Sequence, residues 1–503
     1  MAWIGFTTAV SGLLSSQKSL YTTNHNISNM NTEGYSRQKA AQNATNPLKL
    51  PGIGMLGTGT TITEINRVRD SYINSKYWGE NGPSGEWKVK QETLGEIEKV
   101  FNEPSESAIR KNMDEFFNAL EDLSKNPSDN AYRQAVMEKA VTLTEHINET
   151  ANKLYNVQKE LNFAISTQVK QVNDMAEQIQ RLNKQIFNME IDGSNANDLR
   201  DRRDYIVDKL SEIVNVQVDE STDGKYRVSI GGMSLVDHTE VSKLKYPPNI
   251  KENPLNPTEK LVQVQWETGN QPVNLKGGEM KGLLEIRDGD GLNGEYRGIP
   301  FYINRLNEFS QKIFEKINEQ HYQGQGLNGK SKKFFFTIND KMTSDLGVTD
   351  PNDSNYKDWI KENVKADNIS LSGDILGDLD NIAAASTDQG VEDNGNIKAI
   401  IELRENKTFF DDTIPQGTPE DFVKSILSNV AVDGQQAKRM YDNQRAIVEN
   451  IVIRREAESG VSLNEEVGDM IRFQQSYNAS ARMITTIDAI YDVTINRLGL
   501  VGR

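Results

Sequence analysis

The 503-residue sequence is longer than a single hydrophobic core usually supports, so several domains are expected. Its 57 Lys and Arg against 73 Asp and Glu give a formal net charge of −16, which argues against a nucleic-acid or anionic-membrane partner because no basic patch offsets it. Cysteine is absent, which excludes disulfides, thiolate metal sites and cysteine nucleophiles. No apolar run approaches the 18 residues of a membrane helix, and no cationic start predicts a cleaved secretory signal.

The first 32 residues have a different composition from the rest of the chain. Lys18 is their single charged side chain, and 14 of them are Ser, Thr or Asn. Spacings that alternate between three and four predict a helix with a heptad seam, which ends at Gly34. The seam positions are Trp3, Phe6, Val10, Leu13, Gln17, Leu20, Asn24 and Ile27.

The C-terminal segment carries a second seam with the same alternation. Ser462 and Glu465 predict a capping box at its start. Its seam positions are Phe473, Tyr477, Ser480, Ile484, Ile487, Tyr491, Thr494 and Leu498. Two readings stay open at this point: two amphipathic helices on separate cores, or terminal helices that pair in a coiled coil.

The middle of the chain predicts a rod that is interrupted by a β-rich insert. Residues 128–192 contain neither Gly nor Pro, and a helix over that stretch would reach roughly 90 Å. A further helix is expected over 198–214. The period then changes, because Val216 and Val218 alternate and Asp223 with Gly224 supplies hairpin turn chemistry.

Helical period returns over 303–317 and is followed by an irregular acidic stretch to about residue 413. Thr418, Pro419 and Asp421 then predict the capped start of another long helix, which continues to Ile451. Helical segments therefore flank the β-rich insert, and the chain returns to the end from which it left.

Three candidate chemical sites are weak. Residues 52–57 spell G-x-G-x-x-G, but they neither follow a strand nor open a helix, so a glycine-rich turn is favoured over a dinucleotide site. Asp288, Asp290 and Glu295 resemble a calcium loop without its closing acid. The acids at 198, 201, 204 and 208 alternate with arginines, which favours local ion pairs over a metal cage.

The four histidines at 25, 146, 238 and 321 lie in unrelated contexts, with no metalloprotease motif or nucleophile elbow. No catalytic, cofactor or metal site is expected. The rival classes are an enzyme that uses the acidic loop around Asp288 and a secreted adhesin that uses the β insert.

The stretch "NISNMNTEGYSRQ" after the first helix resembles the N-terminal signature of the bacterial flagellar axial proteins, the rod, hook and hook-associated family. The matching motif residues are Asn31, Gly34, Tyr35, Ser36, Arg37 and Gln38. The family usually has Pro where this chain has Glu33, and more often Ala where it has Met30. Four further stretches match in order, at 57–73, 197–214, 280–289 and 459–488, and the second of these narrows the resemblance to one member of the family.

The resemblance implies a structural subunit with a mostly α fold and a β insert, built from discontinuous elongated domains. The expected order is an N-terminal axial segment at 1–75, a long-helix domain at 76–213, a β-rich outer insert at 214–298, a helical return at 299–328, an irregular mixed insert at 329–415, the last part of the long-helix domain at 416–458 and a C-terminal axial coiled-coil segment at 459–503. The assembly seam is expected at Phe6, Val10, Leu13, Leu20, Asn24, Ile27, Phe473, Tyr477, Ile484, Ile487, Tyr491 and Leu498.

The resemblance also implies partners and a location. The partners are copies of the chain in an axial ring, the hook protein, a second junction protein (hook-associated protein 3) and a cytoplasmic export chaperone on the C-terminal helix. The uncharged start resembles the uncleaved signal for flagellar type III export, so a secreted, extracellular subunit of the flagellum is expected, with termini that stay unfolded until assembly. The polar seam positions Gln17, Asn24, Ser480 and Thr494 are expected to fix register, unless they face a solvated channel.

Overall fold

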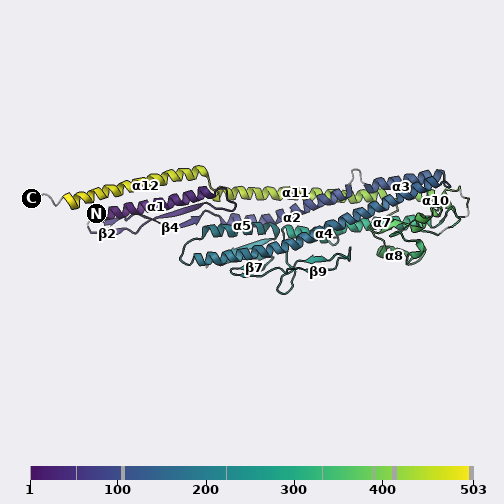
Figure 1. Cartoon of the computed structure of the whole chain (residues 1–503), viewed down its shortest axis with the longest axis horizontal. Helices are drawn as coiled ribbons and strands as arrows, with labels where there is room; N and C mark the ends of the chain where they lie inside the picture. The colour runs from purple at the N-terminus through teal and green to yellow at the C-terminus, as the bar shows by residue number, and fades with distance from the viewer. Residues whose placement is uncertain are drawn as a thin grey trace, which may run out of the picture.

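The computed structural model describes residues 2–51, 54–102, 108–221, 224–330, 332–387, 389–390, 392–410 and 416–497. These residues form a long, narrow molecule with both ends of the chain at one end of its long axis (Figure 1). The arrangement agrees with the expected fold class, because long helices lie at both termini and the sheets are small and antiparallel. Within the described residues, no helix combines the length and the apolar character that crossing a membrane requires.

Long helices build the rod. The longest is α4 (Asn130–Met189), whose 60 residues span about 90 Å, as the absence of Gly and Pro predicts. The Asp129 side chain caps its first turn by accepting a hydrogen bond from the Ala131 amide. The other rod helices are α2 (Ser71–Asn102), α3 (Ala108–Lys125), α5 (Asn197–Ile213), α7 (Ile299–His321) and α11 (Pro419–Ser459). The capping box predicted at Thr418 and Asp421 is present at the start of α11.

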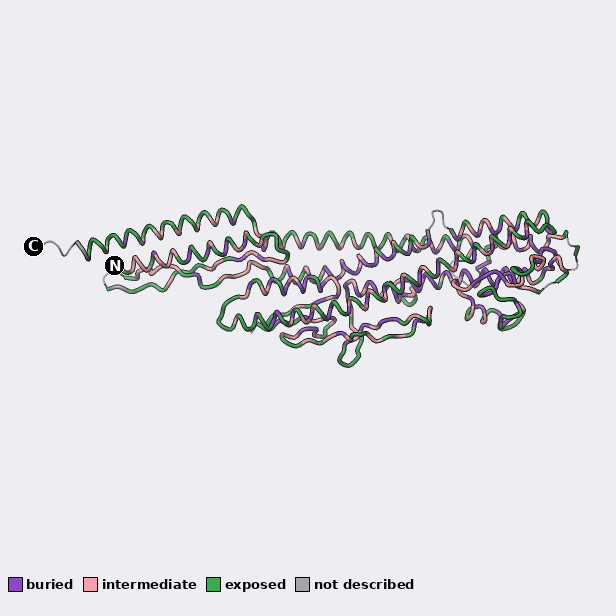
Figure 2. Tube along the Cα trace, in the orientation of Figure 1, coloured by how far each residue is buried: buried purple, intermediate pink, exposed green. Residues whose placement is uncertain are grey.

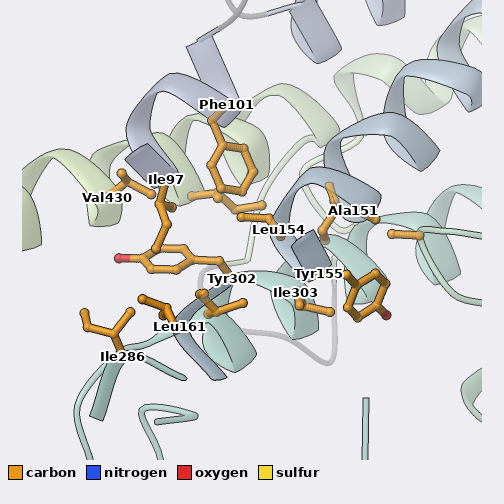
Figure 3. Packing of buried hydrophobic residues seen from close by; sticks show 14 of the residues in the cluster. Ile97, Phe101, Ala151, Leu154, Tyr155, Leu161, Ile286, Tyr302, Ile303 and Val430 are labelled. Atoms are coloured by element: carbon orange, nitrogen blue, oxygen red, sulfur yellow. The ribbon is translucent and has the colours of Figure 1, made fainter. Parts of the chain in front are cut away.

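The hydrophobic core lies where these helices meet. Figure 3 shows Phe101 of α2, Leu154 of α4, Tyr302 of α7 and Val430 of α11 packed together, and all four are buried. They are far apart in the sequence, so this core forms only when the chain has returned along its own rod. Burial of each such side chain contributes roughly 1.5–3 kcal/mol, which makes the rod the stable part of the molecule.

The β-rich insert begins with an antiparallel four-stranded sheet of β5 (Val216–Glu220), β6 (Tyr226–Ile230), β7 (Met233–Asp237) and β8 (Glu240–Val241). Val218 pairs with Val228 in its register, although Asp223 of the predicted turn lies outside the described residues. A second pair, β9 (Asn249–Lys251) with β10 (Leu261–Gln263), follows. The helix α6 (Glu279–Asp288) then packs against α2, so this part of the chain is not β throughout.

Short elements fill the segment after α7 and join the same core. They are β11 (Gly324–Gln325), β12 (Phe336–Ile338), α8 (Tyr356–Asn363), β13 (Ile369–Leu371), α9 (Gly373–Gly377), β14 (Ala385–Ser386) and α10 (Gly395–Glu402). Phe334, Phe335 and Phe336 are almost fully buried there. This segment therefore caps the end of the rod far from the chain termini (Figure 1).

A terminal unit occupies the other end. It consists of α1 (Ala2–Asn29) and α12 (Leu463–Asp492), with β1 (Gln38–Ala44) and β4 (Thr60–Arg67) paired beside α1 and a hairpin of β2 (Leu48–Leu50) and β3 (Gly54–Leu56). Figure 2 shows α12 exposed along most of its length. Apart from Ala9, the buried residues of α1 are Ser, Thr and Asn: Ser15, Ser16, Ser19, Thr22, Thr23 and Asn26. The unit therefore packs through small polar side chains rather than through an apolar core.

Candidate functional site

The turn that follows α1 carries the sequence motif and joins the terminal unit to the rod. Gly34 has φ +78°, a left-handed conformation that glycine adopts without strain. A Cβ atom at this position would lie 2.8 Å from the Cβ of Tyr205 on α5. The glycine is therefore needed for its backbone angle and for the close approach of α5.

Asn26, in the last turns of α1, holds the far side of this turn. Its amide nitrogen donates to the Gln38 carbonyl at 2.9 Å, and its side-chain oxygen accepts from the Gln38 amide at 2.9 Å and from the Tyr35 hydroxyl at 2.8 Å. Asn26 is 1% exposed, so all of these bonds are shielded from water. Burial, together with nearby Asp198 and Asp201, raises the pKa of Tyr35 well above its ordinary value. Tyr35 is therefore a neutral hydrogen-bond donor.

Two motif residues contact α5, which carries the 197–214 sequence block. The Ser36 amide donates to Asp201 at 2.9 Å, and the Gln38 side chain donates to Asp198 at 2.7 Å. Asn31 is exposed at the edge of the turn. Two stretches that the sequence singles out separately thus lie against each other.

Arg37 connects the turn to the start of α12. Its Nε donates to Glu466 at 2.7 Å and its Nη1 donates to Glu465 at 2.8 Å. Its backbone amide donates to the carbonyl of Ser459, the last residue of α11, at 2.8 Å. The capping box predicted at Ser462 and Glu465 is wrong, because the Ser462 side chain makes no cap hydrogen bond and the Glu465 carboxylate bonds Arg37 instead.

The aspartates of α5 pair with arginines from the end of β4. Arg67 Nη1 lies 2.8 Å from Asp201 and 2.9 Å from Asp204, and Arg69 Nη1 lies 3.4 Å from both. Burial by itself would raise the pKa of Asp204, but the neighbouring guanidinium groups, that of Arg69 foremost, lower it below its ordinary value. These pairs join distant segments. Asp204 also lies 3.5 Å from Arg203 Nε on its own helix, so the expected local pairing is present for Asp204, and the distant arginines add to it.

A third connection ties α11 to α5. Arg455 Nη2 lies 2.6 Å from one oxygen of Asp208, and the Trp78 indole donates to the other oxygen at 2.6 Å. Asp208 thus binds two elements of the rod at the level of the turn. With the Arg37 and Arg67 pairs, it makes the turn a charged joint between the terminal unit and the rod.

An open cleft of about 840 Å³ lies at this joint, between the turn, α5 and the corner from α11 to α12. Its charged lining includes Glu33, Arg37, Asp208, Lys209, Glu212, Arg455, Glu456, Glu458 and Glu465. Six acidic groups against three basic ones make the cleft electronegative, in keeping with the net charge of the chain.

The predicted C-terminal seam faces α1 in part. The two helices are antiparallel, since Ser16 bonds Ser476 at 3.1 Å and Asn26 bonds Glu466 at 3.1 Å. Ile487 is buried, with its Cδ1 3.5 Å from where a Cβ of Gly5 would stand. The seam residues Phe473, Tyr477, Ile484 and Tyr491 are half-buried, and Leu498 lies outside the described residues.

Glycines and polar residues beside the predicted N-terminal seam contact α12 within one chain. They are Gly5, Gly12, Ser16 and Asn26. Small residues at these positions let the backbones of α1 and α12 approach closely. The predicted seam residues Phe6, Val10, Leu13, Leu20 and Ile27 are only half-buried, and Asn24 is exposed. Their role in an assembly stays a prediction.

Sequence reasoning missed Asn26 and Glu466, which complete the joint. The sequence could have indicated Asn26, because Asn26 continues the alternating four- and three-residue spacing of the small residues Gly12, Ser16 and Ser19. No sequence feature indicated a role for Glu466, because an acidic residue in the first turn of a helix is common.

The structure also shows the surroundings of the other candidate sites. No group of three His, Cys, Asp or Glu side chains there could hold a metal ion. Asp288 pairs with Arg287 at 2.7 Å and with Lys251 at 3.1 Å. Gly54 of the glycine-rich stretch starts the strand β3 of a hairpin, and Gly52 lies outside the described residues.

Comparison with known proteins shows that the chain is similar to flagellar proteins. Residues 94–336 match the family model described as the flagellar hook-associated protein FlgK helical domain, and residues 456–498 match the flagellar basal body rod FlgEFG protein C-terminal model. The chain is 27% identical to flagellar hook-associated protein 1 of Bacillus subtilis, covering 100% of this chain and 99% of the relative. It is 28% identical to the Escherichia coli protein of that name, covering 97% and 98%.

One solved structure has a similar fold. The flagellar hook junction protein FlgK from Burkholderia pseudomallei matches with a TM-score of 0.61 at 15% sequence identity, covering 77% of this chain and 100% of that chain. At 15% sequence identity, this similarity is evidence for a shared fold only.

Proposed function

We propose that this chain, which is similar over its full length to flagellar hook-associated protein 1, is a structural subunit of the bacterial flagellum at the junction between hook and filament. Its full-length relatives are named flagellar hook-associated protein 1, and these names do not support the adhesin alternative. The proposed location is outside the cell, on the flagellum, after export through the flagellar type III apparatus.

The observation that carries this proposal is the contrast between the two ends of the molecule. The rod has a continuous apolar core, whereas α1 and α12 bury few apolar side chains, among them Ala9 and Ile487. Fixing the backbone of each residue costs roughly 1–2 kcal/mol, and a helix gains most of its stability from packing. A terminal unit with so little buried apolar area is therefore unstable alone, and neighbours in an axial tube would supply the missing contacts.

The joint described above gives the terminal unit a defined position once it folds. Arg37, Asn26 and the α5 aspartates hold the turn against the rod through buried hydrogen bonds. We propose that the terminal helices enter the axial tube, that copies of the chain form a ring on the hook protein, and that hook-associated protein 3 adds to the distal side.

A gene deletion tests this function directly. Cells that lack this chain should keep their hooks and release unpolymerised filament subunits into the medium, and the full chain supplied in trans should restore attached filaments. Attached filaments on the deletion strain would contradict the proposal.

An export chaperone is the remaining proposed partner, because an apolar helix exposed before assembly is an aggregation hazard. We place it on α12, over Phe473, Tyr477, Ile484 and Ile487. Deletion of residues 464–503 should abolish binding while the rod stays folded, and deletion of residues 1–32 should leave binding intact. Undiminished binding by the first truncation would refute this placement.

A further inference from the structure

Large apolar side chains lie exposed along the side of α1 that faces away from α12. Trp3 is 69% exposed, Leu14 is 51% exposed and Tyr21 is 71% exposed. Their spacings of eleven and seven residues place them on one face of the helix. The contacts with α12 run through Gly12 and Ser16 on the opposite face, so α12 of the same chain does not cover these side chains.

Beside Tyr21 this face opens into a mainly apolar groove between α1 and β4. The groove has a volume of about 400 Å³. Its lining consists of Gln17, Lys18, Tyr21, Ile62, Thr63, Glu64 and Ile65.

The helix α12 carries a stripe of its own that the chain leaves uncovered. Leu463, Val467 and Ile471 are 46%, 40% and 55% exposed and follow one another at intervals of four residues. Glu466 and Ser476 contact α1, and at about 100° per residue Ile471 lies about 140° around α12 from both of them. Val467 lies about 100° and Leu463 about 60° from Glu466, so the stripe turns away from α1 toward Ile471.

The groove and the stripe lie at the same height along the molecule. The antiparallel pairing joins Ser16 to Ser476 and Asn26 to Glu466. Tyr21 lies midway between the first members of these pairs, and Ile471 lies midway between the second members. The two side chains are therefore level with each other and point away from the pair on different sides.

We infer that the α1–β4 groove receives the Leu463, Val467 and Ile471 stripe of a second copy of this chain. The inference rests on the proposed function, because it concerns the ring of copies. In a ring, neighbouring copies are related by a rotation about an axis along the rod. This rotation brings a surface on one side of a copy against a surface at the same height on another side of its neighbour. Such a contact is heterologous, so each copy offers its stripe to one neighbour and its groove to the other, and the ring can close.

Charge favours these two surfaces over others. Copies with a net charge of −16 repel one another wherever acidic surfaces meet. The stripe and its outer neighbours Asn464, Gly468 and Gln475 are uncharged, and the groove has one cation, Lys18, and one acid, Glu64. A neutral stripe against a groove without net charge avoids this repulsion.

The area fits a contact that forms only in an assembly. Tyr21 and the three stripe residues, which lie at this height, together offer on the order of 400 Å². A stable pair of proteins usually buries about 1,200–2,000 Å². One such contact falls short of that range, so the chain should stay monomeric before export, and ring closure on the hook supplies the rest.

The absence of cysteine allows a direct test by cross-linking. The variant with Tyr21→Cys and Ile471→Cys, expressed in cells whose own copy is deleted, should form a ladder of reducible oligomers when isolated hooks are oxidised. Within one chain these two side chains point apart, so they cannot bridge to each other. Each single variant should give no dimers. A matched pair, Phe163→Cys with Ile471→Cys, replaces an exposed side chain on the rod instead and should give no ladder.

Restored filaments without a ladder would overturn the inference and leave the proposed function intact. Dimers from Tyr21→Cys alone would indicate a symmetric contact and overturn it too. If the variant with Tyr21→Cys and Ile471→Cys does not assemble, the variant with Gln17→Cys and Gln475→Cys replaces it in the test. These two exposed polar residues are also level with each other, and a ladder of oligomers is again the expected result. Failure of the cysteine-free parent to restore filaments contradicts the proposed function itself.

Discussion

Arg37 and Glu466 are 429 residues apart in the sequence, and the Arg37 Nε donates to the Glu466 carboxylate at 2.7 Å. The Glu466 side chain is 2% exposed, whereas that of Arg37 is 25% exposed. The pair fixes the first turn of α12 to the turn after α1, and Asn26 donates a further hydrogen bond to the same carboxylate. The segment after α1 and the start of α12 thus meet in one ion pair.

Arg37→Ala should loosen the terminal unit. The variant leaves a buried carboxylate with a hydrogen bond from Asn26 but no cation, which should cost about 2–4 kcal/mol after allowance for the partial exposure of Arg37. Hydrogen exchange of the chain assembled on isolated hooks, where the terminal unit is folded, should report this loss as faster opening of α12 relative to α2. The control is Arg472→Ala, which removes an exposed pair with Asp469 on the same helix and should cost at most about 1 kcal/mol. Equal effects of the two variants would contradict a buried joint.

Gly34→Ala should destabilise the turn for two separable reasons. The new Cβ would be strained at φ +78° and would meet the Tyr205 side chain at 2.8 Å. Gly54→Ala is the matched control, because Gly54 has φ +97° and no atom within 4 Å of a Cβ. We expect about 1 kcal/mol from the backbone angle alone and about 1–3 kcal/mol more from overpacking at Gly34. The urea concentration that releases each variant from isolated hooks measures the difference. Equal costs for the two variants would mean that the Tyr205 side chain moves aside without cost.

Asn24→Leu tests the register hypothesis. Asn24 is exposed in a single chain, on the side of α1 toward Tyr21 rather than toward α12. A leucine there adds apolar area of roughly 1–2 kcal/mol and removes a polar group that would be left unpaired in a wrong register. Sedimentation should show self-association of the variant before export, or filaments should be restored poorly. A monomeric variant that builds normal junctions would place Asn24 on a solvated face.

Acid should destabilise the rod through His321. This imidazole is 1% exposed; one ring nitrogen lies 2.8 Å from the Lys333 carbonyl and the other accepts from the Ala383 amide at 2.9 Å. Burial lowers its pKa to about 4 from 6.5. Between those values the unfolded chain binds a proton that the folded chain does not, so stability falls as the pH falls, by about 3 kcal/mol in total.

Urea unfolding between pH 7 and pH 4 measures this loss of stability. His321→Asn should show a shallower pH dependence over that range, even though its stability at pH 7 is lower. An unchanged slope would mean that His321 already carries a proton in the folded chain.

The sequence by itself determined the elements whose causes are local. A stretch without Gly or Pro gives α4, a Thr-Pro-x-Asp start gives α11, and alternation at Val216 and Val218 gives a strand. It also marked the turn at Gly34 to Gln38, but not the partners of that turn. Periodicity and capping depend on residues that are close together in the sequence, so they can be recognised without knowledge of the fold.

Only the tertiary structure decided which faces and charges meet. A heptad pattern shows that a helix has a face but not which neighbour covers it, and α1 turns Gly12 and Ser16 toward α12 because small residues permit close approach. Asp201 and Asp204 of α5 pair with Arg67 and Arg69, which are distant in the sequence, and Asp204 also pairs with the adjacent Arg203, because a buried carboxylate pairs with the cations that share its shielded space. Those distances exist only after the chain has folded back on itself.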